Sequence, residues 1–440
     1  MSAKLIKKPV NGMKDVLPSE MKIRSYCMNI IRENYKSFGF TEIETPCVES
    51  IENLCSKQGG ENEKLIFKIL KRGEKLHGAM EKCMKSFGED TEGEMSERSF
   101  DESILSDSGL RYDLTLPLSR YYACHSNELP SPFKALQMGN VFRADRPQKG
   151  RFRQFMQCDI DILGEPSNLA EIELILATAS TLKKLGFSDF RVRINDRRIL
   201  KGAAIYSGFE EDRLDSVYIT LDKMDKIGEE GVKEELLSDG FDETAVGKYA
   251  NLFKELSVKE NPIAYLKDEL KDVLEADAFD NLSGIMEAVS AAGNEGFEMV
   301  FDPTLVRGMG YYTGTIFEVE MAGLGLSVAG GGRYDKMVGR FTGTDTPACG
   351  FSIGFERIIT ILLDQDFKIP GENEKVAFLL EKGLPSDKIA EAVARAQKLR
   401  NEGRQVLMVR MNKNKKFQKQ QLEEDGYTDF VEFYCQELKR

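Results

Sequence analysis

Apolar positions along the chain repeat with two different periods, and these periods divide it into helices and strands. Residues 20–38 have helical spacing, with Ser19 as a suitable N-cap and Gly39 directly after the last turn. The following sequence, FTEIETPCVES, predicts a strand that ends near Pro46. A strongly apolar helix is predicted over residues 168–185, and the sequence FRVRINDR after it predicts another strand.

A strand, a turn and a second strand are predicted around residues 142–155, which read FRADRPQKGRFRQF. Pro147 and Gly150 favour a turn, and extended, β-rich sequence lies on both sides of them. The segment is basic, because it holds four arginines and one lysine against a single acid, Asp145. The basic residues are Arg143, Arg146, Lys149, Arg151 and Arg153.

The amino-acid composition changes several times along the rest of the chain. The acidic stretch 88–108 is poor in apolar residues and predicts a mobile loop. Residues 199–292 are rich in Glu, Asp and Lys at helical spacing, which predicts a helical insertion. Glycine-rich β sequence then returns and ends in PACGFSIGFERIITILL, which predicts a strand leading through glycines into a helix. Residues 371–375 are typical of a linker, and the tail beyond them predicts the order β-α-β-α-β.

Composition narrows the class of protein and the kind of chemistry. The chain has 440 residues, of which 41% are hydrophobic and 30% charged, which is typical of a globular protein with two or three domains. Its eight cysteines form no CxxC pair and only His77 and His125 are present, so we expect no disulfides, zinc site or histidine-based triad. The N-terminal residues lack an apolar signal core and no long apolar run exists, so we expect a cytoplasmic protein without membrane spans.

The basic segment 142–155 is unusual because the whole chain is acidic, with a formal net charge of −12. A local excess of arginine on an acidic protein is typical of a site that holds an anion. The planar guanidinium group matches phosphate oxygens in particular. A solvated basic hairpin is the alternative interpretation, and the segments described next favour the anion site.

Two glycine-rich segments, GGGRYD (330–335) and GFSIGFERI (350–358), indicate a second part of the site. Glycine lets the backbone approach a ligand closely and adopt positive φ angles. The spacing matches neither GxGxxG nor a P-loop, so neither of those nucleotide sites is predicted. A glycine-rich strand that delivers Arg357 at the start of a helix suits a nucleotide phosphate or base, and a simple tight turn is the alternative.

The segment LVRGMGYYTGTIFE (305–318) carries groups suited to a small polar ligand. Arg307 precedes Tyr311 and Tyr312 among glycines, and the tyrosines offer hydroxyl groups and aromatic faces. A strand with exposed aromatic residues is the alternative for this segment alone.

The segment LRYDLTLPLSRY (110–121) offers a carboxylate. We expect Asp113 and Thr115 on the same face of a strand, where the carboxylate would receive an amino group. A salt bridge of Asp113 with Arg111 or Arg120 is the alternative.

Taken in chain order, these segments resemble the histidyl-tRNA synthetase family of class II aminoacyl-tRNA synthetases. FGFTEIETP is similar to class motif 1, FRADRPQKGRFRQF to motif 2 and GFSIGFERI to motif 3. LVRGMGYYTGT and GGGRYD resemble the two histidine-specific signatures of the family. The resemblance covers roughly residues 8–365.

The resemblance implies an α+β fold. A class II catalytic domain on an antiparallel sheet would occupy residues 1–198 and 293–368, and a helical insertion domain would occupy residues 199–292. Residues 374–440 would form a short C-terminal α/β domain similar to the family's anticodon-binding domain. Within it, MNKNKKFQKQQ carries four lysines and no acid, which is typical either of an RNA-facing helix or of a solvated helix face.

The resemblance also implies an activity. The chain would be a histidine–tRNA ligase that activates histidine with ATP and Mg²⁺, releases pyrophosphate and transfers histidine to the 3′ end of tRNA(His). Motif 1 forms a dimer interface in the family, so a homodimer is expected. A histidine-sensing regulatory subunit of ATP phosphoribosyltransferase, which has no ligase activity, is the alternative from the same family.

The resemblance assigns site residues position by position. The implied ATP-binding residues are Arg143, Asp145, Arg151, Phe155 and Arg357. The implied histidine-binding residues are Asp113, Thr115, Arg143, Gln157, Asp161, Arg307, Tyr311 and Tyr312. Arg143 and Arg307 would be the catalytic pair at the α-phosphate, and no metal ligand is expected from His or Cys.

Overall fold

The structure, a computed structural model, describes residues 5–55, 61–89, 102–148, 150–256, 258–293, 295–307, 310–321, 325–371 and 374–436. The chain divides into two compact units. One holds residues up to Asp15 together with Cys27–Leu362, and the other holds Val16–Tyr26 and Leu363–Arg440. The domain boundaries expected from the sequence remain predictions.

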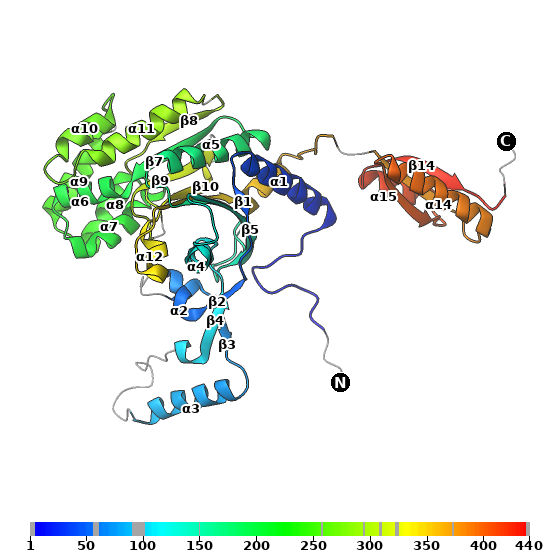
Figure 1. Cartoon of the computed structure of the whole chain (residues 1–440), viewed down its shortest axis with the longest axis horizontal. Helices are drawn as coiled ribbons and strands as arrows, with labels where there is room; N and C mark the ends of the chain where they lie inside the picture. Colours follow the sequence, from blue (N-terminus) through cyan, green and yellow to red (C-terminus); the bar gives the residue numbers. More distant parts are fainter. Residues whose placement is uncertain are drawn as a thin grey trace. The chain divides into compact units, whose positions relative to one another are not determined.

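The first unit is built on a mostly antiparallel sheet of eight strands, ordered β1-β5-β6-β11-β10-β9-β7-β8 (Figure 1). Only the two edge pairs, β1 with β5 and β7 with β8, are parallel in the described residues. The strands are β1 (Thr41–Glu42), β5 (Phe133–Phe142), β6 (Gln154–Leu163), β11 (Ala348–Gly354), β10 (Leu326–Arg333), β9 (Thr315–Met321), β7 (Phe190–Asp196) and β8 (Phe297–Phe301). The antiparallel sheet expected for the catalytic domain is therefore confirmed.

Several predicted elements are present with nearly the predicted bounds. The first helix is α1 (Pro18–Ser37), and the apolar helix is α5 (Leu169–Lys184), which packs on β6 and β11. The predicted hairpin is the pair β5–β6, joined by the basic segment. The predicted strand-to-helix unit is β11 followed by α13 (Phe355–Asp364). These segments could be predicted because each has a clear local period.

The single strand predicted from FTEIETPCVES is wrong, because the structure divides this sequence between two sheets. Its start is β1 in the large sheet, and its end is β2 (Val48–Ser50) in a small sheet of order β2-β4-β3. Pro46 lies between them and cannot donate a backbone hydrogen bond, which fits a break at this point. The other strands of the small sheet are β4 (Ser106–Leu110) and β3 (Lys68–Leu70).

The loop expected over the acidic stretch 88–108 is not found where the structure describes this stretch. Residues 90–101 lie outside the described residues, α3 (Glu74–Glu89) ends before them, and η2 (Glu102–Leu105) leads directly into β4. For residues 102–108 the loop prediction is wrong, because Ser106 is buried and pairs with Leu70 of β3. Strand pairing across the sheet outweighs the low apolar content here.

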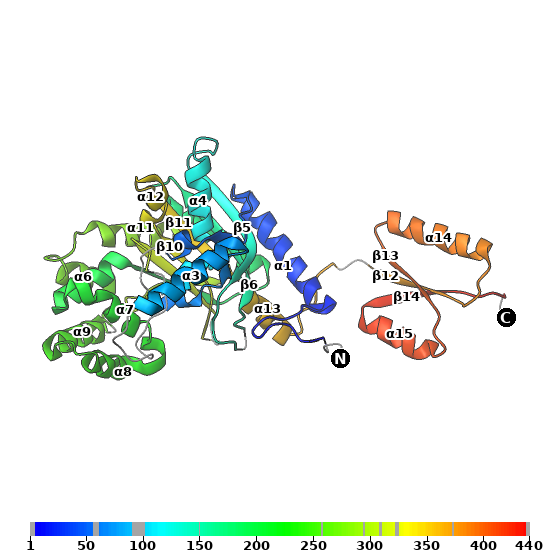
Figure 2. The same ribbon diagram turned by 90° about the horizontal axis from the view of Figure 1, so that it is seen from below.

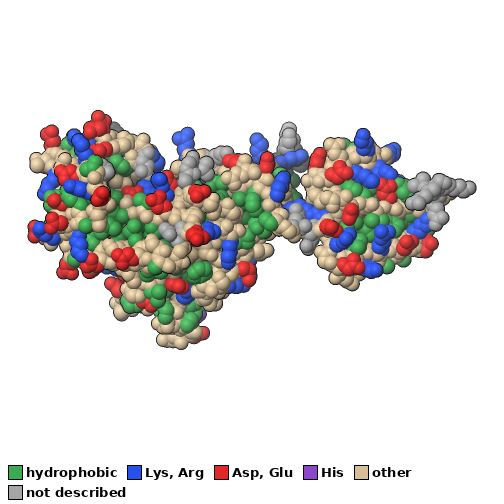
Figure 3. Space-filling view, turned by 90° about the horizontal axis from the view of Figure 1, so that it is seen from above, with side chains coloured by type: hydrophobic (Ala, Val, Ile, Leu, Met, Phe, Trp, Pro, Cys, Tyr) green, Lys and Arg blue, Asp and Glu red, His purple; other side chains and the backbone are tan. Residues whose placement is uncertain are grey.

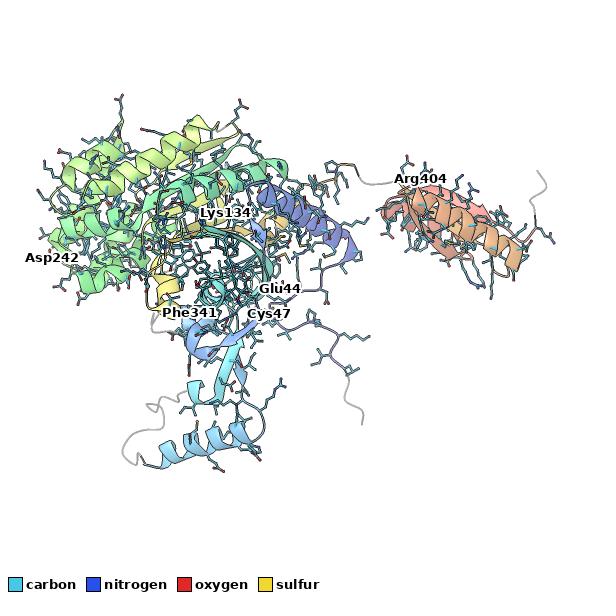
Figure 4. The ribbon with its side chains drawn as sticks, viewed as in Figure 1. Glu44, Cys47, Lys134, Asp242, Phe341 and Arg404 are labelled. Carbon is cyan, nitrogen blue, oxygen red and sulfur yellow. The ribbon has the colours of Figure 1, made fainter. Side chains whose placement is uncertain are left out.

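Lys134 connects three parts of the first unit and is labelled in Figure 4. Its Nζ donates to the carbonyl of Phe38 at 2.6 Å and to Glu173 Oε2 on α5 at 2.5 Å. The same ammonium group lies 4.7 Å from the centre of the Phe40 ring. One cation on β5 thereby holds the end of α1 and the covering helix α5 against the sheet.

Residues 197–291 form the predicted group of helices, drawn in green in Figure 1. They are α6 (Arg197–Ser207), α7 (Leu214–Leu221), α8 (Met224–Ser238), α9 (Glu243–Leu256), α10 (Pro262–Glu269) and α11 (Asp277–Ala291), with the short η3 (Glu211–Arg213). Phe209 packs edge-on against Phe241 and Tyr249, each at 5.3 Å between ring centres. Figure 3 shows acidic and basic side chains intermingled over this group of helices.

The second unit confirms the predicted order β-α-β-α-β. Its strands β12 (Lys375–Leu380), β13 (Gln405–Arg410) and β14 (Tyr427–Phe433) form a parallel sheet of order β13-β12-β14. Helices α14 (Ser386–Asn401) and α15 (Lys415–Glu424) lie on opposite sides of it (Figure 2). Lys415 and Lys419 of α15 each lie 2.7 Å from Glu432, so two of the four lysines in MNKNKKFQKQQ are ion-paired within the unit.

No helix in the described part of the chain is both long enough and apolar enough to span a bilayer.

Candidate active site

A cavity of about 1100 Å³ opens on one face of the large sheet. Its floor is formed by β6, β11, β10 and β9, and residues outside these strands, among them Asp113, Arg143, Asp222 and Arg307, complete its lining. The twelve residues expected from the sequence all line this one cavity. They are Asp113, Thr115, Arg143, Asp145, Arg151, Phe155, Gln157, Asp161, Arg307, Tyr311, Tyr312 and Arg357.

Strand β6 supplies a row of side chains to the cavity floor. Phe155, Gln157, Asp159 and Asp161 alternate along the strand and therefore share one face. The Gln157 amide donates to Ser352 Oγ on β11 at 3.0 Å. One oxygen each of Gln157, Asp159 and Asp161 is buried without a hydrogen-bond partner among the described residues. Buried polar atoms are normally paired, so these oxygens are suited to receive the donors of a ligand.

The two aspartates of this row carry raised pKa values. Burial raises the pKa of Asp161 to about 7, although a hydrogen bond from Tyr334 opposes the rise. Burial, and then the neighbouring carboxylate of Asp161, raise the pKa of Asp159 well above its usual range. Asp113 is also buried, and burial raises its pKa. The cavity therefore combines three carboxyl groups whose ionised forms are not fully compensated by the protein itself.

Tyr334 is a site residue that sequence reasoning missed. Its ring is 1% exposed, and its hydroxyl donates to Asp161 Oδ1 at 2.6 Å. The Tyr311 ring lies 4.9 Å from the Tyr312 ring and 6.1 Å from the Tyr334 ring, measured between centres. Three tyrosines thus surround one end of the cavity around Asp161. The signal was present in the sequence, because Tyr334 belongs to the segment GGGRYD.

The expected placement of Asp113 and Thr115 on a strand is wrong. Strand β4 ends at Leu110, and Thr115 is the first residue of α4 (Thr115–His125). Asp113 precedes this helix, and its Oδ1 accepts the backbone N–H of Leu116 at 3.1 Å, as a helix-capping carboxylate does. The alternative salt bridge is not formed among the described residues, since Arg120 pairs with Glu49 at 2.6 Å and Arg111 donates to the Thr45 and Asn140 carbonyls. Both residues nevertheless reach the cavity.

Arg143 leaves the end of β5 and lies between two aromatic rings. Its guanidinium carbon is 4.2 Å from the centre of the Tyr112 ring and 5.1 Å from that of Phe155. Its Nε donates to the Tyr112 carbonyl at 3.1 Å. Stacking and this one hydrogen bond orient the guanidinium group.

The remaining basic residues of the segment differ in their surroundings. Arg151 Nε lies 3.0 Å from Asp145 Oδ2, so the two residues expected at opposite ends of a nucleotide pair with each other. The Arg151 side chain is 54% exposed, which leaves it accessible to a ligand. Lys149 lies outside the described residues.

Arg307 also lines the cavity and is held by an acid. It pairs with Glu318 of β9, and the other oxygen of Glu318 lies 3.5 Å from Arg193. Glu318 is a second residue that sequence reasoning missed. Its position was predictable, because it belongs to the segment LVRGMGYYTGTIFE.

The glycines of β10 and β11 create room for charged side chains. A Cβ atom on Gly330 would lie 2.5 Å from the guanidinium carbon of Arg307, and one on Gly350 would lie 2.0 Å from Asp161 Oδ1. None of these glycines has a positive φ angle, and both lie inside strands, so the tight-turn alternative is wrong. The predicted close approach is present, and the approaching groups are the protein's own Arg307 and Asp161.

Arg357 enters the cavity from the first turn of α13. It donates a hydrogen bond to the Ser327 carbonyl of β10. Glu356 beside it is 7% exposed, and its Oε1 accepts the backbone N–H of Met156 at 3.3 Å. This helix start therefore ties β6 and β10 together at the nucleotide end expected from the sequence.

The comparisons with known proteins agree with this geometry. A family model described as Histidyl-tRNA synthetase matches residues 80–358 of the chain. A histidine–tRNA ligase of Leifsonia xyli subsp. xyli is 43% identical over 416 residues, which cover 93% of this chain and 91% of that protein. The chain belongs to the histidyl-tRNA synthetase family.

Other members agree in sequence and structure. A probable histidine–tRNA ligase of Tropheryma whipplei is 43% identical over 366 residues, 80% of each chain. The crystal structure of histidyl-tRNA synthetase from Nostoc sp. PCC 7120 has a TM-score of 0.75 at 27% identity, and the match covers 96% of this chain and 90% of that one. A structure from Bacillus halodurans C, titled as an ATP phosphoribosyltransferase regulatory subunit/histidyl-tRNA synthetase, has a TM-score of 0.73 at 21% identity and covers 98% of each chain. At that identity the second structure shows a shared fold alone.

Proposed function

We propose that the chain is a histidine–tRNA ligase whose cavity activates histidine with ATP. One observation carries this proposal. The cavity joins a polar, tyrosine-lined end around Asp161 to an arginine-rich end around Arg143, Arg307 and Arg357. The first end suits an amino acid with a polar ring, and the second suits a triphosphate.

The activation step needs electrostatic help more than a base. A carboxylate oxygen of histidine attacks the α-phosphorus of ATP, the bond from that phosphorus to the bridging oxygen breaks, and pyrophosphate leaves. The carboxylate is ionised at pH 7, so no proton has to be removed. Arg143 and Arg307 would stabilise the charge that collects on the α-phosphate, and one such donor is typically worth about 3–4 kcal/mol of barrier.

The polar end explains selection of histidine. A neutral imidazole carries one N–H donor and one acceptor nitrogen. The second oxygen of Asp161 is buried and unpaired among the described residues, so it would accept the imidazole N–H. Tyr311 and Tyr312 would complete the pocket. Asp113 with Thr115 would hold the α-amino group, and Gln157 would lie near the carboxylate and amino end of histidine. A site of this kind rejects an apolar analogue by about 10⁴-fold, because its own polar atoms would remain unpaired.

The arginine-rich end would hold ATP. Phe155 and Arg357 would cover the two faces of the adenine ring, and Asp145 would accept its amino group. Arg151 would reach the γ-phosphate, which fits its exposed side chain. In this arrangement the pair between Asp145 and Arg151 opens when the nucleotide enters.

Magnesium would enter with the nucleotide. No cluster of three or more potential ligands is present among the described residues, and Mg²⁺ commonly uses one or two carboxylates together with substrate phosphates. Glu356, a buried carboxylate in the cavity wall, is a suitable ligand of this kind. When bound, the metal ion would reduce the negative charge of the triphosphate.

The second step and the assembly follow from the same proposal. A ribose hydroxyl at the 3′ end of tRNA(His) attacks the carbonyl carbon of histidyl-adenylate, and AMP leaves. We propose a cytoplasmic homodimer with the catalytic domain in residues 1–198 and 293–368, the helical insertion in residues 199–292 and a tRNA-contacting domain in residues 374–440.

The test is the charging of tRNA(His) with labelled histidine. A ligase forms acid-precipitable histidyl-tRNA in the presence of ATP. Absence of charging, together with tight binding of histidine by calorimetry, would instead support a histidine-sensing regulatory subunit.

A further inference from the structure

The loop between β5 and β6, residues 143–153, carries Arg143, Asp145 and Arg151, and is called the ATP loop below. Within the loop, Arg151 pairs with Asp145, and Gln148 and Arg151 exchange two backbone hydrogen bonds at 2.9 and 3.2 Å. The backbone N–H of Arg143 donates to the Arg153 carbonyl at 2.9 Å, and Arg153 Nε donates to the Asp145 carbonyl at 3.0 Å. A loop that projects from a two-stranded hairpin is mobile unless other elements hold it.

The N-terminal turn, Val10–Met13, contacts the ATP loop from outside the sheet. The turn is closed by a hydrogen bond from Met13 N to the Val10 carbonyl at 2.9 Å. The Gly12 carbonyl accepts the backbone N–H of Arg153 at 2.8 Å, and the Asn11 carbonyl accepts Arg153 Nη1 at 3.3 Å. One arginine of the loop is thus bound through both its backbone and its side chain.

The packing at Gly12 is close on two sides. A Cβ atom there would lie 2.7 Å from Arg153 Cγ and Cδ and 2.9 Å from Pro147 Cγ. Pro147 and Arg153 lie on opposite arms of the ATP loop, so the turn touches both arms. Gly12 also has a φ angle of 84°, which an L-residue adopts only with strain. Both space and backbone conformation therefore require glycine.

Two further contacts hold the loop in the same position. Lys14 Nζ lies 4.8 Å from the centre of the Phe152 ring, next to Arg151. On another side, the backbone N–H of Ala144 donates to the Leu65 carbonyl at 2.8 Å. The loop is consequently supported between the N-terminal turn and residues 61–65.

We propose that the N-terminal turn is a positioning element for ATP, because it holds the ATP loop in the conformation that binds the nucleotide. This inference rests on the proposed function, since it assigns the loop to ATP. A loop ordered before binding does not lose that conformational entropy when the ligand arrives, so affinity is higher. The residues of the turn do not line the cavity, and their effect must pass through Arg153 and Pro147.

The decisive variant is Gly12→Ala, compared with Gly240→Ala. Gly240 has a similar φ angle of 78°, but a Cβ atom there meets nothing within 4 Å. Both variants introduce comparable backbone strain, and only Gly12→Ala pushes on the ATP loop. We expect Gly12→Ala to raise the KM for ATP in pyrophosphate exchange by about tenfold and to leave the KM for histidine within about twofold. Gly240→Ala should leave both KM values unchanged.

A second variant and a second readout separate positioning from general damage. Arg153→Met keeps the aliphatic packing and removes the side-chain bonds to Asn11 and Asp145, so it should also raise the KM for ATP selectively. Hydrogen exchange of the ATP-loop amides should accelerate in Gly12→Ala and stay constant in Gly240→Ala.

Two outcomes would overturn the inference. One is an unchanged KM for ATP in Gly12→Ala. The other is an equal rise in the KM values for ATP and histidine, together with a lowered melting temperature. If the unmodified chain shows no exchange, the proposed function fails, and ATP binding measured by calorimetry on the same variants still decides the role of the turn.

Discussion

The Tyr334 hydroxyl donates a hydrogen bond to Asp161 Oδ1 at 2.6 Å, and both side chains are buried beneath the cavity. This bond fixes which oxygen of Asp161 remains for a ligand, since the second oxygen is unpaired among the described residues. The pair comes from β6 and from the end of β10, two strands on either side of β11. Under the proposed function, recognition of the imidazole ring would therefore depend on a residue that is not itself required to touch it.

Tyr334→Phe should weaken the binding of histidine more than the binding of ATP. A hydrogen bond to a charged group contributes about 1.5–3 kcal/mol, so the KM for histidine in pyrophosphate exchange should rise by roughly tenfold or more. Tyr249→Phe is the matched control, because its buried hydroxyl in α9 has no hydrogen-bond partner among the described residues. Equal effects of the two substitutions on histidine would refute the orienting role of Tyr334.

Asp161→Asn should change how stability depends on pH. Burial, helped by the nearby Asp113 and opposed by the hydrogen bond from Tyr334, raises the pKa of Asp161 from 3.8 to about 7. Between pH 4 and 7 the folded chain keeps a proton that the unfolded chain has lost, so stability decreases as pH rises through this window. Above pH 7 the cost is complete and is on the order of 4 kcal/mol.

The asparagine carries no such cost, so the variant should resist urea better than the unmodified chain at pH 8 and about equally at pH 4.5. Urea unfolding at both pH values measures this difference. A variant that is less stable at pH 8 than the unmodified chain would show that Asp161 is compensated in the folded state.

Gly330→Ala should reduce turnover because it displaces the side chain of Arg307. The added Cβ atom would lie 2.5 Å from the guanidinium carbon, so Arg307 would leave its place beside Glu318. Loss of one donor at the reacting phosphate typically lowers kcat by about 10²-fold. Gly247→Ala in α9, where a Cβ atom meets nothing within 4 Å, is the control and should keep full exchange activity. A normal kcat in Gly330→Ala would exclude Arg307 from the reaction.

The C-terminal unit offers a separate test of RNA contact. Lys413 and Lys416 are exposed, whereas Lys415 and Lys419 pair with Glu432. Changing Lys413 and Lys416 together to glutamate should raise the KM for tRNA and reduce its salt dependence, with pyrophosphate exchange unaffected. Lys398→Glu, on α14 at the other side of the small sheet, is the control. Unchanged charging by the double variant would leave α15 as a solvated helix face.

The sequence predicted those parts of the fold that have a strong local period. The β5–β6 hairpin, α5 and the C-terminal β-α-β-α-β order needed only local signals, namely the period of the apolar positions and the residues that favour turns. Residues 106–108 were mispredicted as a loop because their strand is stabilised by pairing with β2 and β3 rather than by composition. Asp113 and Thr115 were mispredicted as strand residues because the capping role of Asp113 becomes visible only once α4 is present.

The candidate site, like the fold, could be predicted from the sequence only in part. The resemblance supplied twelve residues that line one cavity, because motif residues can be transferred position by position. Asp159 could have been added from alternation along β6, since it lies between Gln157 and Asp161. The need for glycine at position 330 could not have been predicted. The side chain that fills the space beside it belongs to Arg307, 23 positions earlier in the chain. Contacts of that kind depend on the tertiary structure rather than on any local pattern.

The most direct test of the central claim is ATP–pyrophosphate exchange with each of the twenty amino acids in the absence of tRNA. The account predicts exchange with histidine and background levels with the other nineteen. Exchange with a different amino acid, or with none although histidine and ATP both bind, would contradict the assignment of this cavity to histidine activation.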